Sequence, residues 1–139
     1  MGPMGVDRAY LKARVREARD AMRNLIRLSS KPFESLSLDE IYSMRYQIIV
    51  LAEAIGSICI HIALEDLNYE PSSLSDCVSY LSQAGLLDCA EDIISMFKLR
   101  NLLVHRYWVI DDRKVMSSVR ENFKCVERFL KWVEERYGL

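Results

Sequence analysis

Hydrophobic residues recur every three or four positions along most of this chain, which is the spacing of helices that each bury one face. Five such stretches predict helices at about residues 7–28, 37–68, 73–85 and 88–107, and a last one from 112 through 133. Few glycines and prolines separate these stretches, too few turn residues for a β protein. The pattern therefore predicts an all-α fold, an antiparallel bundle of about five helices joined by short connections.

The second predicted helix is apolar on more than one face. Ser37 and Glu40 form a capping-box pair at its start. Its main apolar stripe consists of Ile41, Met44, Ile48, Leu51, Ile55, Ile58 and Ile62, and its other faces add Ile49, Val50, Ala52, Cys59, Ile60 and Leu64. Such a helix has to be covered on several sides. Either it serves the core with one face and a second copy with another, as in a homodimer, or it is fully buried in the bundle.

The composition fits a single globular domain. The chain has 139 residues, of which 50% are hydrophobic and 28% are charged. We expect residues 1–6 to be a flexible leader or a cloning remnant, and residues 7–139 to form the one domain. The leader lacks an apolar signal segment, and no stretch approaches the roughly 18 uninterrupted apolar residues of a membrane span. We therefore expect no membrane partner.

The formal net charge of −1 gives no general positive field for nucleic acid, so such a partner would need a local patch. A basic stripe on the first helix consists of Arg8, Lys12, Arg16, Arg19, Arg23 and Arg27. Arg19 and Arg23 are candidate contacts for an RNA backbone or for the acidic surface of a partner protein. The ordinary explanation is a solvated helix face, which nearby acidic residues dilute.

The four cysteines, Cys59, Cys77, Cys89 and Cys125, lie 18, 12 and 36 residues apart. This spacing fits neither zinc ligands nor a small disulfide scaffold. We therefore expect reduced, mostly buried thiols in a cytoplasmic protein, with no metal and no cofactor.

Polar chemistry is concentrated at the end of the fourth predicted helix. Arg100, Asn101, His105 and Tyr107 combine a fixed cation, an amide, an imidazole and a phenol, groups that can grip a phosphate and move a proton beside it. Asn101 and His105 stand one helical turn apart, so the amide could orient the ring. Arg100 and His105 point about 140° apart on a regular helix. To meet at one atom they need either an irregular helix or two protomers.

The motif R-x-x-x-x-H-x-Y, from Arg100 to Tyr107, resembles the signature of HepT-like proteins in the HEPN superfamily. The segments 53–55, 61–62, 84–88 and 107–115 are also similar to this family, so that the resemblance covers nearly the whole chain. It implies a helical homodimer that acts as a metal-independent ribonuclease toxin. It also implies a small nucleotidyltransferase antitoxin of the MntA type as partner, with Tyr107 as the target of transferred AMP.

RNA cleavage without a metal needs a base for the 2′-hydroxyl proton, positive charge at the phosphate and an acid for the leaving oxygen. His105 can supply the proton transfers, because histidine exchanges a proton near neutral pH, and Arg100 can supply the charge. In a dimer one His105 could act as the base and its mate as the acid. Arg106, within the motif, is a further candidate for contact with RNA or a partner.

A rival hypothesis from another class is a non-catalytic helical adaptor that binds a nucleotidyltransferase or a nucleotide. The two differ in whether the purified protein cuts RNA in EDTA and whether His105 is needed. A metal-dependent phosphohydrolase is the weakest of the three functional hypotheses, because His61 and His105 lie 44 residues apart without a paired ligand motif. His61, set among apolar residues, fits a core or interface histidine.

Overall fold

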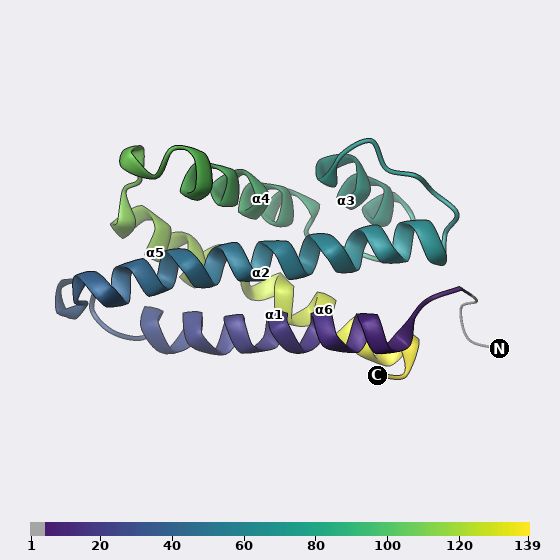
Figure 1. The fold of residues 1–139 in the computed structure, drawn as a ribbon, viewed down its shortest axis with the longest axis horizontal. Helices are drawn as coiled ribbons and strands as arrows, with labels where there is room; N and C mark the ends of the chain where they lie inside the picture. The colour runs from purple at the N-terminus through teal and green to yellow at the C-terminus, as the bar shows by residue number, and fades with distance from the viewer. Residues whose placement is uncertain (1–4) are drawn as a thin grey trace.

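The computed structural model describes residues 5–139, and these residues contain only helices, turns and loops (Figure 1). The α-helices are α1 (Arg8–Ser29), α2 (Leu38–Glu65), α3 (Leu74–Gln83), α4 (Ala90–His105), α5 (Asp112–Asn122) and α6 (Lys124–Tyr137). Two 3-10 turns, η1 (Phe33–Ser35) and η2 (Tyr107–Val109), follow α1 and α4. The predicted all-α class is confirmed.

Helix α2 runs through the middle of the molecule, between α1 on one side and α3 with α4 on the other (Figure 1). Leu51, Ile55 and Ile62 are fully buried in the core that these helices share. Much of the apolar surplus of α2 is therefore covered within the chain, while Ile49 and Ile60 remain partly exposed. Among the described residues, α2 is also the helix long and apolar enough to cross a membrane, with a mean hydropathy of 2.0, as buried core helices often are.

The start of α1 is fixed against the end of α2. The Asp7 side chain accepts a hydrogen bond from the Tyr10 backbone N–H, and the Asp7 backbone N–H donates to His61 Nε2 at 2.9 Å. The His61 ring also lies on Tyr10, with centroids 4.9 Å apart. His61 is thus a structural histidine, as the sequence suggested. Of the expected leader, residues 1–4 lie outside the described residues, and Val6 packs against the core.

The capping box at the start of α2 is confirmed, because Ser37 Oγ accepts from the Glu40 backbone N–H and Glu40 accepts from that of Ser37. Glu40 also pairs with Lys31 at 2.6 Å. These bonds, the one from Lys31 above all, lower the pKa of the Glu40 carboxyl from 4.5 to about 2. A carboxyl with a lowered pKa stabilises the fold above its unfolded pKa, and that contribution is lost as the pH falls through the folded pKa.

We therefore expect Glu40→Gln to unfold at a lower temperature than the wild type at pH 6. This difference should shrink as the pH falls from about 4.5 towards 2. Thermal unfolding followed by circular dichroism across this range measures it. A difference that stays constant with pH would show that the charge of Glu40 has no part in it.

The last predicted helix is wrong in one respect: it is divided at Phe123 into α5 and α6. Phe123 leaves the helical conformation with φ −94° and ψ 1°, yet its side chain stays buried. The bend allows both halves to contact α1. The hydrophobic spacing continues across the bend, so periodicity alone cannot reveal it. Residues 5–139 thus form six α-helices instead of about five.

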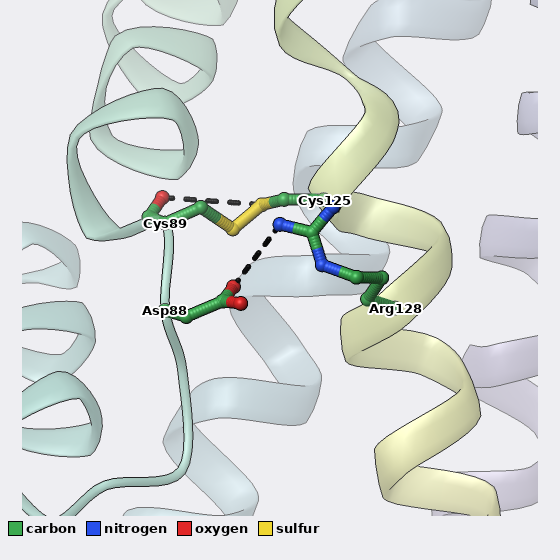
Figure 2. Close-up of a disulfide and its surroundings, with 4 residues drawn as sticks. All are labelled: Asp88, Cys89, Cys125 and Arg128. Carbon is green, nitrogen blue, oxygen red and sulfur yellow. Dashed lines mark hydrogen bonds and ion pairs between the residues drawn. A yellow bond between two sulfur atoms is a disulfide. The ribbon is translucent and has the colours of Figure 1, made fainter.

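The cysteine prediction holds for two residues and fails for two. Cys59 and Cys77 are free and buried, and burial raises the pKa of both thiols, that of Cys77 to about 11. Cys89 and Cys125 form a disulfide, with Cα atoms 6.2 Å apart (Figure 2). The bend at Phe123 explains the error, because it brings the first turn of α6 to the start of α4 despite a sequence separation of 36.

Candidate active site at the end of helix α4

Helix α4 presents the motif at its C-terminal end. Ile93, Met96, Phe97 and Leu103 are buried and fix the helix in the bundle. The helix is uninterrupted from 90 to 105, and Arg106 then leaves it with φ −140° and ψ 45°. The motif residues Asn101, His105, Arg106 and Tyr107 are all exposed. The chemistry-bearing groups therefore stand on a rigid support and face outward.

Arg100 is held in place by two neighbours. Its Nε donates to Glu53 Oε1 on α2 at 2.8 Å, and Nη2 donates to the same oxygen. Its Nη1 donates to the Asn101 amide oxygen at 2.9 Å. Arg100 is 29% exposed, so the guanidinium is oriented yet accessible. We expected Asn101 to orient His105, and the structure instead gives its amide oxygen to Arg100.

Glu53 is the residue that sequence analysis missed as part of the site. Its carboxylate pairs with a motif cation from another helix, 47 positions away. A signal was present in the sequence: Glu53 is the one acidic residue between Arg45 and Glu65 on an otherwise apolar helix.

A cavity of about 250 Å³ lies beside this ion pair, between α2 and α4. Its lining consists of Ala52, Glu53, Gly56, Ser57, Ile60, Leu74, Phe97, Arg100 and Asn101. Gly56 lets Leu74 at the start of α3 approach α2 closely at this cavity, because a Cβ on Gly56 would stand 3.2 Å from Leu74 Cδ2. The cavity therefore has mainly apolar walls with the Arg100 and Glu53 charges beside them.

Tyr107 lies in η2, which is anchored to two other helices. Arg45 on α2 binds both carboxylate oxygens of Asp112 on α5, at 2.7 and 2.8 Å. The same guanidinium donates to the Tyr107 carbonyl oxygen at 3.4 Å. The Tyr107 side chain itself is free, 61% exposed, with its ring edge-on to Trp108. The arrangement presents a phenol to solvent from a fixed backbone.

Arg100 and His105 do not meet within one chain. Arg100 turns towards α2, whereas His105 is exposed on the last turn, and no hydrogen bond joins the two side chains in the part of the chain that the structure describes. Because α4 is a continuous helix through both residues, the alternative of an irregular helix is wrong. Of the two alternatives, the combination of two protomers is the one that stays a prediction.

The candidate contacts on α1 lie elsewhere. Arg19 bonds to Glu134 and to Glu127, the latter at 2.9 Å, and these partners, Glu134 foremost, raise the pKa of Arg19. Arg23 pairs with Asp20 at 2.9 Å. Helix α1 lies on the opposite side of α2 from α4 (Figure 1). The structure therefore does not bring Arg19 or Arg23 to the motif, and their ion pairs favour the solvated-face explanation.

One group of side chains in the described residues has the composition of a metal site. The ligand atoms of Asp88, Cys89 and Cys125 lie within 4.8 Å of one another. Both sulfurs are used by the disulfide, and the group lies at the opposite end of α4 from His105. It is not connected with the chemistry of the motif.

A sequence model of the family described as "Ribonuclease HepT-like" matches residues 15–133. No curated protein sequence matches the chain significantly.

Solved structures share the fold. A tri-AMPylated HEPN toxin of Shewanella oneidensis, in complex with an MNT antitoxin, is 18% identical with a TM-score of 0.81, covering 91% of this chain and 97% of that one. The cytosolic protein YutE of Bacillus subtilis, of unknown function, is 14% identical with a TM-score of 0.82, covering 95% and 91%. A mutant MntA toxin–antitoxin structure is 17% identical with a TM-score of 0.78, covering 91% and 98%.

Proposed function

This chain belongs to the HepT-like ribonuclease family, and we propose that it is an endoribonuclease, the toxin of a toxin–antitoxin pair. One observation carries the proposal: the C-terminal end of α4 and the following turn η2 leave Arg100, His105 and Tyr107 accessible, with Arg100 oriented by Glu53. A structural arginine would be neutralised on all sides. Here the Nη1 edge is held only by the Asn101 amide, which a phosphate oxygen can replace.

A homodimer completes this site. Arg100 and His105 lie on different faces of one helix, so a two-fold axis near α4 would bring the His105 of one protomer to the Arg100 of its partner. Exposed apolar side chains beside the motif, Leu102, Val104 and Val109, supply surface for such an interface. A shared cleft would then contain two imidazoles and two guanidinium groups.

In the proposed reaction the 2′-oxygen of the RNA attacks the adjacent phosphorus and displaces the 5′-oxygen of the next nucleotide. One His105 removes the 2′-hydroxyl proton, and its mate protonates the leaving oxygen. Arg100 stabilises the negative charge that develops on the phosphate. These groups supply the proton transfers and the charge without a metal ion.

Exposed aromatic rings near the motif suit an unpaired RNA strand. Tyr42 and Tyr46 on α2 are more than half exposed, as are Tyr107 and Trp108 on η2. Arg45 links the two pairs, because it lies over the Tyr42 ring and bonds to the Tyr107 backbone. Bases of single-stranded RNA stack on such rings. We therefore include single-stranded RNA, with Arg106 as a phosphate contact, in the proposal.

The proposed partner is a nucleotidyltransferase antitoxin of the MntA type. The structural neighbour from Shewanella is described as AMPylated and bound to an MNT antitoxin. In this chain Tyr107 is the motif phenol, and its exposure makes it accessible to the phosphorus of a bound nucleotide. Attack by the phenol oxygen of Tyr107 on the α-phosphate of ATP would form the tyrosyl–AMP bond and release pyrophosphate. The added phosphate carries negative charge into a site meant for RNA.

The test of the proposed activity is RNA cleavage by the purified protein in the presence of EDTA. We expect cleavage of single-stranded RNA that does not depend on a divalent metal. The non-catalytic adaptor predicts no cleavage under any condition, with intact binding to the nucleotidyltransferase. We place the reaction in the cytoplasm, where one structural neighbour is described as occurring.

Glu53 is a positioning residue in this scheme, so Glu53→Gln should lower kcat by about 10- to 100-fold while RNA binding changes little. The amide keeps the shape of the side chain and loses the charge that orients Arg100. The matched control is Glu65→Gln, an exposed acid at the far end of the same helix. Equal kcat values for Glu53→Gln and the wild type would remove Glu53 from the mechanism.

A further inference from the structure

The disulfide between Cys89 and Cys125 joins the start of α4 to the first turn of α6 (Figure 2). Helix α4 packs mainly on α2 and α3, whereas α6 packs mainly on α1 and α5. The bond therefore ties the helix that carries the motif to a part of the bundle it otherwise contacts little. Beside the disulfide, Arg128 and Asp88 form an exposed ion pair at 3.3 Å, which stabilises the contact between the two helices only slightly.

The two sulfurs differ in accessibility. Cys89 is half-buried at the N-cap position of α4, whereas Cys125 is 3% exposed. The N-cap residue of α4 is Cys89, and no side chain in the described residues caps this helix start. Cys89 is therefore the more accessible of the two residues for a thiol from solution.

Asp88 lies beside both sulfurs, because its ligand atom and the Cys89 and Cys125 sulfurs are all within 4.8 Å of one another. Both cysteines also stand at helix starts that have no capping side chain in the described residues. The unequal exposure of the two residues therefore decides which sulfur is attacked.

We propose that Cys89–Cys125 is a site of reversible thiol–disulfide exchange with a low-molecular-weight thiol, in which Cys89 is attacked and α4 is released from α6. The inference does not depend on RNA cleavage. It rests on the disulfide, on the unequal exposure of its sulfurs and on the helices that it joins.

The exchange has two balanced steps. The thiolate of the small thiol attacks Cys89 Sγ, a mixed disulfide forms, and the electron pair of the broken bond goes to Cys125 Sγ, which takes up a proton. A second small thiol attacks the sulfur of the first, which frees Cys89 as a thiol. The small thiols are oxidised to their own disulfide, and the protein gains two thiols.

The experiment exposes the folded protein to reduced glutathione without denaturant and follows thiols by maleimide labelling and intact mass. We expect the mass of the wild type to rise by two hydrogens and Cys89 to become reactive to maleimide, and both changes to reverse in oxidised glutathione. Its melting temperature should fall by about 10 °C on reduction, because the bond closes a loop of 36 positions. Amide hydrogen exchange in the first turns of α4 should become faster.

Single variants test the direction of attack. With oxidised glutathione, Cys125→Ser should acquire one glutathione on Cys89, whereas Cys89→Ser should acquire none on the buried Cys125. The buried Cys59 and Cys77 remain unlabelled in every sample and serve as internal controls. A disulfide that glutathione reduces only in denaturant would overturn the proposal. So would four free thiols in the protein kept in oxidised glutathione, or equal glutathione uptake by the two variants.

Discussion

Replacing His105 by alanine should lower the rate of RNA cleavage by about 10² to 10⁴, because a general acid and base is lost. Replacing Arg100 by alanine should have a loss of similar size, because the transition-state charge at the phosphate is left without its cation. Both side chains are outside the core, so both variants should keep the wild-type melting temperature. The measurement is a single-turnover cleavage assay in EDTA.

The control for these variants is Lys98→Ala, which removes an exposed cation from the same helix without touching the motif. It should cleave RNA at the wild-type rate. A mixture of the His105→Ala and Arg100→Ala proteins tests the shared site directly. In a mixed dimer the shared cleft keeps only one His105 and one Arg100, so a mechanism that needs one His105 as base and the other as acid predicts that activity does not return. Wild-type cleavage by either single variant would contradict the assignment of that residue.

The second large expected effect is the loss of RNA cleavage when AMP is transferred to Tyr107. Wild-type protein incubated with the cognate nucleotidyltransferase and ATP should gain AMP on Tyr107 and stop cleaving RNA. Tyr107→Phe lacks the phenol oxygen that would carry the nucleotide, so it should gain no AMP at this position and continue to cleave. Intact-mass measurement combined with the cleavage assay follows both properties in one sample.

Tyr46→Phe is the matched control, because Tyr46 is 62% exposed against 61% for Tyr107 and lies at the same end of the molecule. This variant should be modified and silenced like the wild type. If Tyr107→Phe were silenced to the same extent as the wild type, another residue would be the target. Escape of Tyr46→Phe from silencing would equally contradict the assignment.

Local signals predicted most of the fold. Repeating apolar positions and the Ser37 capping box identify the first four helices to within a few residues, because both act over one or two helical turns. The sequence did not predict the division of the last helix at Phe123, because this buried phenylalanine continues the apolar stripe on either side of the bend. The position of a bend depends on what the two halves of the helix pack against, and the neighbouring residues in the sequence do not indicate these contacts.

For the site, too, the sequence predicted the features that are set locally and missed those that depend on tertiary packing. The motif places Arg100 and His105 on one helix, and their divergence follows from helical geometry alone. Their partners Glu53 and Asn101 depend on the crossing of α2 and α4 and on a side-chain rotamer. The same holds for the bond from Arg45 to Asp112, which spans 67 positions. Contacts of this range follow from tertiary packing, and one sequence gives no direct measure of it.

The anchoring of η2 by Arg45 limits how modification at Tyr107 can act. Because Arg45 on α2 is itself paired with Asp112 on α5 and donates to the Tyr107 carbonyl oxygen, we expect the backbone of the turn to keep its position when a nucleotide is attached to the phenol. The attached AMP would then block the motif residues, and the protein would keep its native fold. An enzyme that hydrolyses the tyrosyl–AMP bond should therefore return a fully competent protein at once, with no refolding step.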